Sequence, residues 1–515
     1  MASYDRAARL LALLALAAPC AGFAPGVALG APPRMARGGV TGASPVYGGA
    51  LARVGGGLRR SLVMSGSATA SGEGGEAPAP LSVPKLAGDT PMANCVVNLM
   101  KNIVGSGVLC LAGGVAVMTD TPAMVIVGLG VALAFSLIAG YCFALVGRVS
   151  KITGAQSYTE GWALTVGDKS KWIPNVIVVF KTWSACLIYS MIIGDLFTDL
   201  AATAGITKLA GVAVNRNSII FTSHLFGLLP LCLLRSFKVL SYASFLGIGG
   251  LIFTAFFMIL RLVEGSYAPG GVFFKQLVAK GGKKLVVSSF NVAGTQAIKA
   301  LILISMLTNS YLCHYNSPKF LRELKDATTK RFSQMTYTSF IGAFVMNALF
   351  MVGGFLTFGG ASKGLILNNY ATTDALATVS RGAIGLSILF GYPLTFEGFR
   401  SSATEFAKVK EPSQKLKDII AVGFIASVCA GAMVLRDLGV VVSFLGALLG
   451  SFVIYVFPSM MYRGARRKEL EQSGNKDAAL GTDYHAAGAL IGLGTFLGLL
   501  GATVVVLKAC TNVLK

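Results

Sequence analysis

The feature that most constrains this sequence is a series of long apolar stretches, each bounded by charged residues, glycine, proline or polar clusters. An α-helix needs about 20 mainly apolar residues to cross a bilayer, and about eleven stretches have that length. Only 13% of the residues are charged, whereas a soluble domain carries roughly 25%. The sequence therefore predicts an all-α integral membrane protein whose spans begin near Cys95, Pro122, Ile173, Ser218, Val239, Phe290, Phe332, Leu376, Ile419, Val440 and Ala486.

The net charge of +22 would suit a nucleic-acid partner, but the distribution of the charge does not. Most of the lysines and arginines lie in the segments between apolar stretches and in the N-terminal leader. Such cations set membrane orientation and face anionic headgroups, so the expected partner is the lipid bilayer and not nucleic acid. The nine cysteines form no CxxC pair, and neither HExxH nor GxSxG occurs. We therefore expect no enzyme, no catalytic residues, no metal and no cofactor.

The first ninety or so residues differ in composition from the rest of the chain. An apolar run from Leu10 to Ala18 suits a signal peptide and is too short to span a bilayer. After it, no acidic residue occurs before Glu73, while arginine, serine and glycine recur, as in transit peptides. Phe23, which follows the expected cut, resembles the bipartite leaders of algae with complex plastids. We predict a signal peptide at residues 1–22, a transit-peptide-like segment at 23–66, a disordered linker at 67–90 and a transmembrane domain at 91–510.

Two of the apolar stretches are interrupted by polar residues and glycine at membrane depth. The first holds a Gly-Ser-Gly sequence from Gly105, and the sixth holds a Thr-Asn-Ser sequence from Thr308. Backbone groups freed by a break find no partner in lipid, and paired breaks in two halves of a chain mark the substrate site of secondary transporters. The alternative is that the glycines only allow close helix packing. The predicted substrate-binding residues are Gly105, Ser106, Gly107, Val108, Thr308, Asn309 and Ser310.

Short motifs in a specific order along residues 91–462 resemble the amino acid/auxin permease family, within the amino acid–polyamine–organocation transporters. The motifs are Asn98-Leu-Met-Lys101-Asn102-Ile-Val-Gly105-Ser106-Gly107, Ser157-Tyr158, the segment from Tyr189 to Asp195, Cys313-His314, Phe358-Gly359 and Tyr392-Pro393-Leu394. The resemblance implies two inverted repeats of five helices with broken first and sixth helices, one extra helix, and amino acids as substrates. Sodium-coupled relatives carry a hydroxyl side chain just before the eighth-helix proline, where this chain has Leu389, Phe390 and Gly391.

Ionisable residues at membrane depth are candidates for coupling or gating because they are costly to place there. Lys101, flanked by Asn98 and Asn102, would supply a fixed positive charge or extend its ammonium to the interface. Asp195 would act as a gate or a structural cap, and His314 would relay protons or simply pack between helices. Glu397 would titrate or pair with Arg400 one turn away. We expect Lys181 and Lys299 to extend toward the interface.

Together these features predict a secondary active or facilitative transporter of amino acids or related small zwitterions. Its expected partners are the amino acid substrate, protons and the bilayer, and transport is expected to be independent of sodium. The alternatives are a non-transporting amino acid sensor, which usually needs a substantial soluble extension, and a structural membrane subunit, which has no need of two broken helices. The leader predicts a plastid envelope membrane, with an endomembrane or vacuolar membrane as the alternative.

Overall fold

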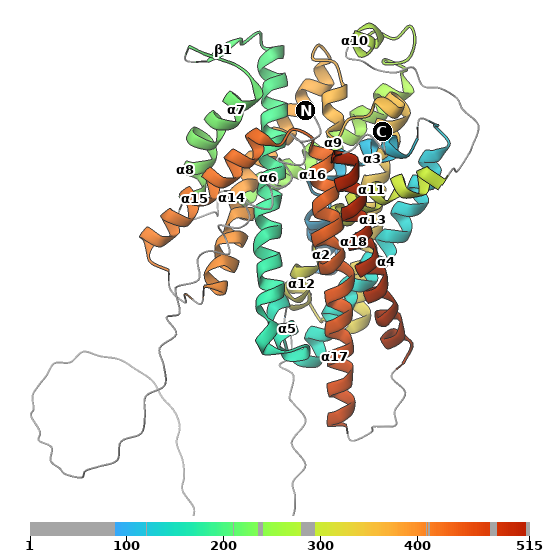
Figure 1. Cartoon of the computed structure of the whole chain (residues 1–515), viewed down its shortest axis with the longest axis vertical. Helices are drawn as coiled ribbons and strands as arrows, with labels where there is room; N and C mark the ends of the chain where they lie inside the picture. Colours follow the sequence, from blue (N-terminus) through green and yellow to red (C-terminus); the bar gives the residue numbers. More distant parts are fainter. Residues whose placement is uncertain are drawn as a thin grey trace, which may run out of the picture. The chain divides into compact units, whose positions relative to one another are not determined.

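The computed structural model describes residues 88–119, 121–209, 211–234, 240–279, 294–407, 409, 412–473 and 481–510. The predicted signal peptide, transit-peptide-like segment and most of the predicted linker lie outside these residues. Within them, each of the eleven expected spans contains a helix or a run of consecutive helices (Figure 1). The all-α architecture is confirmed, with one short β-hairpin of β1 (Lys208–Leu209) and β2 (Val212–Ala213) in the segment that follows α6.

The first five expected spans are formed by the elements up to α9. The first is broken and the fourth is made of three short helical pieces. The elements are α2 (Met92–Ile103), η2 (Ser106–Cys110), α3 (Leu111–Met118), α4 (Met124–Thr153), α5 (Tyr158–Thr165), η3 (Asp168–Ser170), α6 (Trp172–Thr203), α7 (Arg216–Thr222), η4 (Ser223–Leu228), α8 (Leu229–Cys232) and α9 (Leu240–Val263).

The remaining six expected spans follow the short helix α10. The elements are α10 (Phe274–Ala279), α11 (Gly294–Ser310), η5 (His314–Asn316), α12 (Ser317–Glu323), α13 (Thr329–Phe358), η6 (Gly359–Ala361), η7 (Ile366–Asn369), α14 (Ala375–Phe406), α15 (Gln414–Val434), α16 (Leu438–Leu445), η8 (Gly446–Gly450), η9 (Phe452–Val456), α17 (Phe457–Gln472) and α18 (Thr482–Cys510).

Within the described residues, seven helical segments are long and apolar enough to span a bilayer alone, and the bent first span makes an eighth. The other three expected spans do not meet that criterion within the described residues. The α9 helix contributes an apolar segment at Gly247–Val263, α11 ends at the second break, and the run from α7 to α8 is divided by the π-helix η4. A break therefore ends the helix of the sixth expected span, and a π-helix interrupts the fourth.

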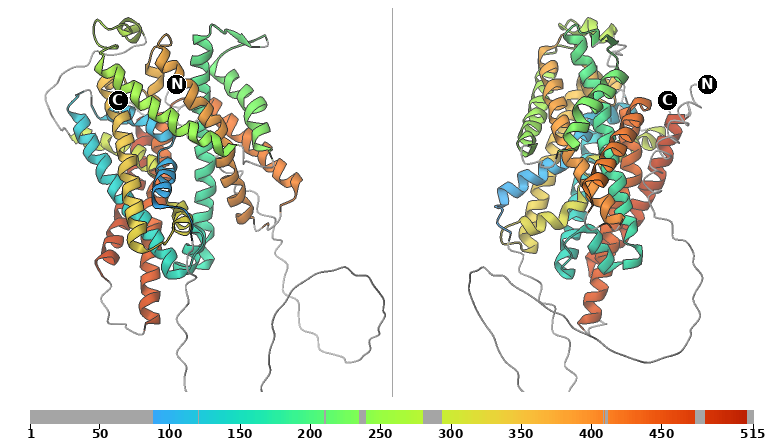
Figure 2. Two further views of the ribbon diagram at one scale, coloured as in Figure 1. Left: turned by 180° about the vertical axis from the view of Figure 1, so that it is seen from behind. Right: turned by 90° about the vertical axis from the view of Figure 1, so that its left-hand side faces the viewer.

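The long helices pack side by side, with α6 against α14, α4 against α13, and α17 against both α4 and α18. Figure 1 shows α6, α17 and α18 lying roughly along the vertical axis of the view, and Figure 2 shows the bundle from two other sides. Large apolar side chains lie on the outside of the bundle, including Ile126 at 71% exposed and Phe226 at 76%. Exposed apolar surface of this kind is unfavourable in water and is expected where the solvent is lipid.

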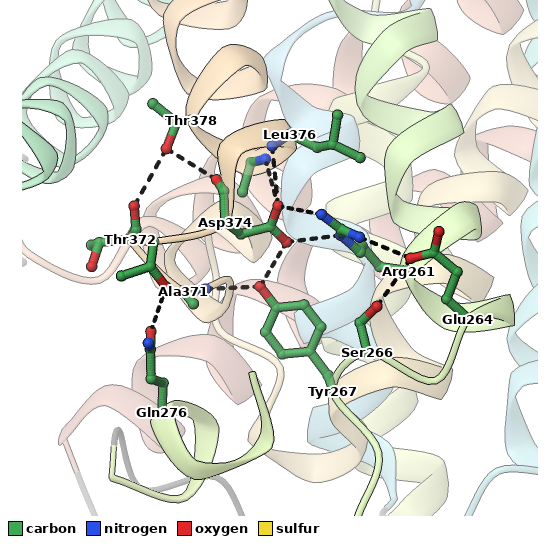
Figure 3. A network of polar contacts seen from close by, with 12 residues as sticks. Arg261, Glu264, Ser266, Tyr267, Gln276, Ala371, Thr372, Asp374, Leu376 and Thr378 are labelled. Atoms are coloured by element: carbon green, nitrogen blue, oxygen red, sulfur yellow. Dashed lines mark hydrogen bonds and ion pairs between the residues drawn. The ribbon is translucent and has the colours of Figure 1, made fainter. Parts of the chain in front are cut away.

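The segment between α13 and α14, residues 359–374, is fixed to the bundle by buried polar groups (Figure 3). Asp374 caps α14 by accepting hydrogen bonds from the backbone N–H groups of Leu376 and Ala377 at 3.0 and 3.4 Å. Its carboxylate also accepts from Arg261 at 2.9 and 3.0 Å and from the Tyr267 hydroxyl at 3.0 Å. Burial raises the pKa of Tyr267, so its phenol stays protonated and can donate.

Asp374→Ala is expected to lower the stability of the folded protein by about 1–3 kcal/mol, because Arg261 loses its buried partner and keeps only the pair with the more exposed Glu264 at 2.8 Å. The variant also removes a helix cap. Thermal unfolding of the purified protein in detergent measures the effect. Asp168→Ala is the control, because Asp168 is exposed and pairs with the exposed Lys171 at 2.7 Å, and such a pair contributes about 0–1 kcal/mol. Equal melting temperatures for the two variants would contradict the assignment.

Candidate functional site

The first span is broken at the predicted Gly-Ser-Gly sequence. The α2 helix ends at Ile103, Val104 and Gly105 leave the helical conformation, and η2 begins at Ser106. The two halves of the span are bent by 46°. Val108 N–H donates to the Gly105 carbonyl at 3.3 Å. Ser106 and Gly107 are the first two residues of the second half, and a helix has no internal acceptor for the N–H groups at its start. Neither N–H group donates to another described backbone group.

The second break falls at the end of α11. The helix stops at Ser310, residues 311–313 are non-helical, and the chain resumes as η5 and α12. Leu312 N–H donates to the Asn309 carbonyl at 3.4 Å, in a tightened last turn. The final carbonyls of a helix lack partners within it, so this end of α11 presents acceptors where η2 presents donors.

The two breaks lie against each other. A Cβ built on Gly107 would lie 3.3 Å from Asn309 Nδ2 and 3.4 Å from Ser310 Cα. Thus the structure brings Gly107 of the first span together with Asn309 and Ser310 of the sixth, whereas no atom lies within 4 Å of a Cβ built on Gly105. The Thr308 side chain points elsewhere, because its methyl group packs against Gly450 of η8 and its hydroxyl donates to the Ile304 carbonyl at 2.8 Å. Only the backbone of Thr308 is therefore available to the junction.

Lys181 of α6 reaches the junction, contrary to the expectation that its side chain extends toward the interface. The residue is 8% exposed, and its ammonium donates to Asn309 Oδ1 at 3.3 Å. A lysine near the middle of the third apolar stretch is visible in the sequence. The contact is not, because the two residues are 128 positions apart.

The residues predicted for coupling and gating are spread over several parts of the bundle. Lys101 is half-buried on α2, before the first break, and Asn98 is exposed. Asn102 is exposed and accepts from Asn316 Nδ2 at 3.2 Å. The structure places these three residues on α2, outside the contact between η2 and α11.

His314 and Glu397 each have a local partner. His314 is fully buried, its Nε2 lies 2.8 Å from the Ala139 carbonyl, and its ring packs against Phe143 and Phe340. Glu397 forms an ion pair with Arg400, as the alternative interpretation of this residue predicted. None of these contacts involves a residue of the junction between the two breaks.

Asp195 lies at a polar junction near the end of α6. It pairs with Arg216 of α7 at 2.6 Å and accepts from Asn368 Nδ2 at 3.2 Å. Asn368 belongs to the segment 359–374, and the buried Arg381 donates to three backbone carbonyls of that segment at 2.8–3.3 Å. Asp195 therefore connects α6 and α7 to the segment 359–374.

A cavity of about 460 Å³ lies beside this segment. Gly113 and Val117 of α3 and Met306 of α11 contribute to its wall, so it adjoins both broken spans. The segment approaches α3 so closely that a Cβ on Gly113 would lie 2.6 Å from the Lys363 carbonyl oxygen. The charged residues that line the cavity are Asp195, Lys363, Arg436, Asp437 and Lys508.

Comparison with known proteins identifies the class. The family model described as "Transmembrane amino acid transporter protein" matches residues 89–479. The chain belongs to this family. This amino acid transporter is 26% identical over 376 residues to the Danio rerio protein provisionally named sodium-coupled neutral amino acid transporter 11, covering 73% of this chain and 79% of that protein. It is 22% identical over 378 residues to vacuolar amino acid transporter 5 of Schizosaccharomyces pombe, covering 71% and 83%.

Solved structures agree with the fold of this amino acid transporter. The inward-facing conformation of Mhp1 matches with a TM-score of 0.53 at 11% identity, covering 82% of this chain and 90% of that structure. The prediction of a multi-pass transporter that is not an enzyme is confirmed by the family match. The two broken spans therefore belong to a transport protein, and their junction is its candidate substrate site.

Proposed function

We propose that the amino acid substrate binds where the two breaks meet. The N–H groups of Ser106 and Gly107 would receive the α-carboxylate, because they are free donors at the positive end of a helical segment. Carbonyls at the end of α11, from Thr308 to Ser310, would receive the α-ammonium. The predicted contribution of Val108 is reduced, since its N–H already donates to Gly105. The observation that carries the proposal is the direct contact of Gly107 with Asn309 and Ser310.

Uptake into proteoliposomes tests this proposal. The full chain should move at least one labelled amino acid into vesicles faster than empty vesicles do, and an excess of the same unlabelled amino acid should compete. Binding without net or exchange movement would instead support a sensor, and absence of both binding and movement would support a structural subunit.

We further propose that transport is independent of sodium and linked to protons. The support is chemical: a hard cation needs oxygen ligands, and the positions before Pro393 hold Leu389, Phe390 and Gly391, which have no side-chain oxygen. Lys101 before the first break would supply a fixed positive charge. His314 and Glu397 are the proposed groups that titrate during the cycle. The relatives named for sodium coupling make this the point at which the chain is expected to differ from them.

The proposed location is a plastid envelope membrane, on the basis of the leader composition alone. A fluorescent reporter carrying residues 1–60 is expected to reach the plastid in an alga with a complex plastid. Phe23→Ala should misroute most of the reporter, because the aromatic residue would no longer follow the signal-peptide cut. Fluorescence microscopy measures the distribution. Retention of the unaltered reporter in the endoplasmic reticulum, beside a working control leader, would contradict the proposal.

A further inference from the structure

Several buried or half-buried arginines in the described residues lie beside a carboxylate. Arg216 pairs with Asp195, Arg261 with Asp374, and Arg381 with Asp199. Lys181 differs from them, because among the described residues no carboxylate lies within 4.0 Å of its ammonium. Its contact is the side-chain amide oxygen of Asn309, which carries no net charge.

A buried ammonium bonded only to a neutral amide is incompletely stabilised. Removing a charge from water is unfavourable unless an opposite charge and further hydrogen bonds replace the lost hydration. The C-terminal end of α11, where Asn309 lies, supplies about half of an elementary negative charge. That partial charge and one amide leave a positive excess at the junction of the breaks. An anion bound there would complete the neutralisation.

The junction is also the proposed substrate site, so the substrate itself can bring that anion. The α-carboxylate and α-ammonium of an amino acid cancel each other, and a neutral zwitterion would leave the Lys181 charge unmatched. A second carboxylate, on the substrate side chain, would match it. Asn309 lies between Gly107 and Lys181, which places the ammonium within one side-chain length of the donors proposed for the α-carboxylate.

We infer that Lys181 is the counter-ion of a side-chain carboxylate, and that the substrates of this transporter are amino acids with acidic side chains. This inference rests on the proposed function and adds the substrate class to it. It also separates the chain from relatives whose printed names specify neutral amino acids. Discrimination between substrates with and without a side-chain carboxylate should be strong, because a substrate that lacks it leaves the Lys181 ammonium buried and unpaired.

The test compares amino acids that differ only in a carboxylate and its amide. Proteoliposomes containing the full chain receive either L-glutamate or L-glutamine, and either L-aspartate or L-asparagine, with the same tracer amount. In at least one pair, uptake of the acid should exceed uptake of the amide by about tenfold or more, which corresponds to about 1.4 kcal/mol. Equal uptake, or preference for the amide in both pairs, would overturn the inference while leaving amino acid transport intact.

Variants of Lys181 test whether its ammonium causes the preference for the acid over the amide. Lys181→Met keeps most of the apolar stem and should reduce the acid-to-amide ratio by about tenfold or more, whereas Lys181→Arg should retain preference for the acid. Lys171→Met is the control, because Lys171 is exposed at the start of the same span, and it should leave the ratio unchanged. An unchanged ratio in Lys181→Met would overturn the inference.

A binding measurement covers the case in which Lys181→Met does not transport. The acid should raise the melting temperature of the unaltered protein in detergent more than its amide does, and Lys181→Met should lose this difference. Persistence of the difference in the variant would overturn the role of Lys181. Absence of uptake for every amino acid tested with the unaltered protein would overturn the proposed function as well.

Discussion

Gly107→Leu is expected to reduce amino acid uptake by at least about 100-fold, a loss of roughly 2.7 kcal/mol in transition-state or binding free energy. A Cβ at this position already lies 3.3 Å from the Asn309 amide and 3.4 Å from Ser310 Cα, closer than most side chains tolerate. The rest of the leucine side chain would therefore occupy the space between the two breaks. Uptake into proteoliposomes, compared at equal protein incorporation, measures the loss.

The variant should still fold, because overpacking one site costs about 1–3 kcal/mol and the rest of the bundle is unchanged. Gly130→Leu is the matched control: Gly130 is an exposed residue of α4, and no atom lies within 4 Å of a Cβ built there. It should transport normally. Normal uptake by Gly107→Leu would show that the substrate binds elsewhere, for example in the cavity beside Asp195.

The break in the first span was predictable because it follows from backbone chemistry. Gly105 and Gly107 stand within an apolar stretch, and the backbone they free must find partners inside the protein. The pairing of this break with a second one in the sixth span then predicted that the two spans form one site. In the structure the two spans do meet, because Gly107 of the first lies against Asn309 and Ser310 of the sixth.

The role of Lys181 could not be predicted in the same way. A lysine in an apolar helix has a side chain long enough to extend to the interface, and this was the expectation. Whether it does depends on which residue of another helix lies opposite, and Asn309 comes from a distant span. The ion pairs that hold the segment 359–374 were missed for the same reason, since Arg261 and Asp374 are 113 positions apart.

Replacing external sodium with choline is expected to leave transport unchanged, whereas abolishing an inward proton gradient should reduce accumulation of the substrate by at least about tenfold. A transporter concentrates its substrate only if an ion binds its two states unequally. In the proposed cycle that ion is the proton, and the residues before Pro393 offer sodium no side-chain oxygen. Uptake into proteoliposomes, with and without an imposed pH gradient, provides the measurement.

Lys101→Ala is expected to uncouple or inactivate transport, because the variant removes the fixed positive charge before the first break. Uncoupling would appear as uptake that equilibrates the substrate but no longer responds to the proton gradient. His314→Ala should shift the pH dependence of uptake, while Lys151→Ala, at an exposed lysine that donates to Thr329, should change neither property. Uptake that collapses in choline and ignores the pH gradient would contradict proton coupling. In that case backbone oxygens must form the cation site, and the Leu389 carbonyl is the first to consider, since Pro393 has no N–H to donate to it.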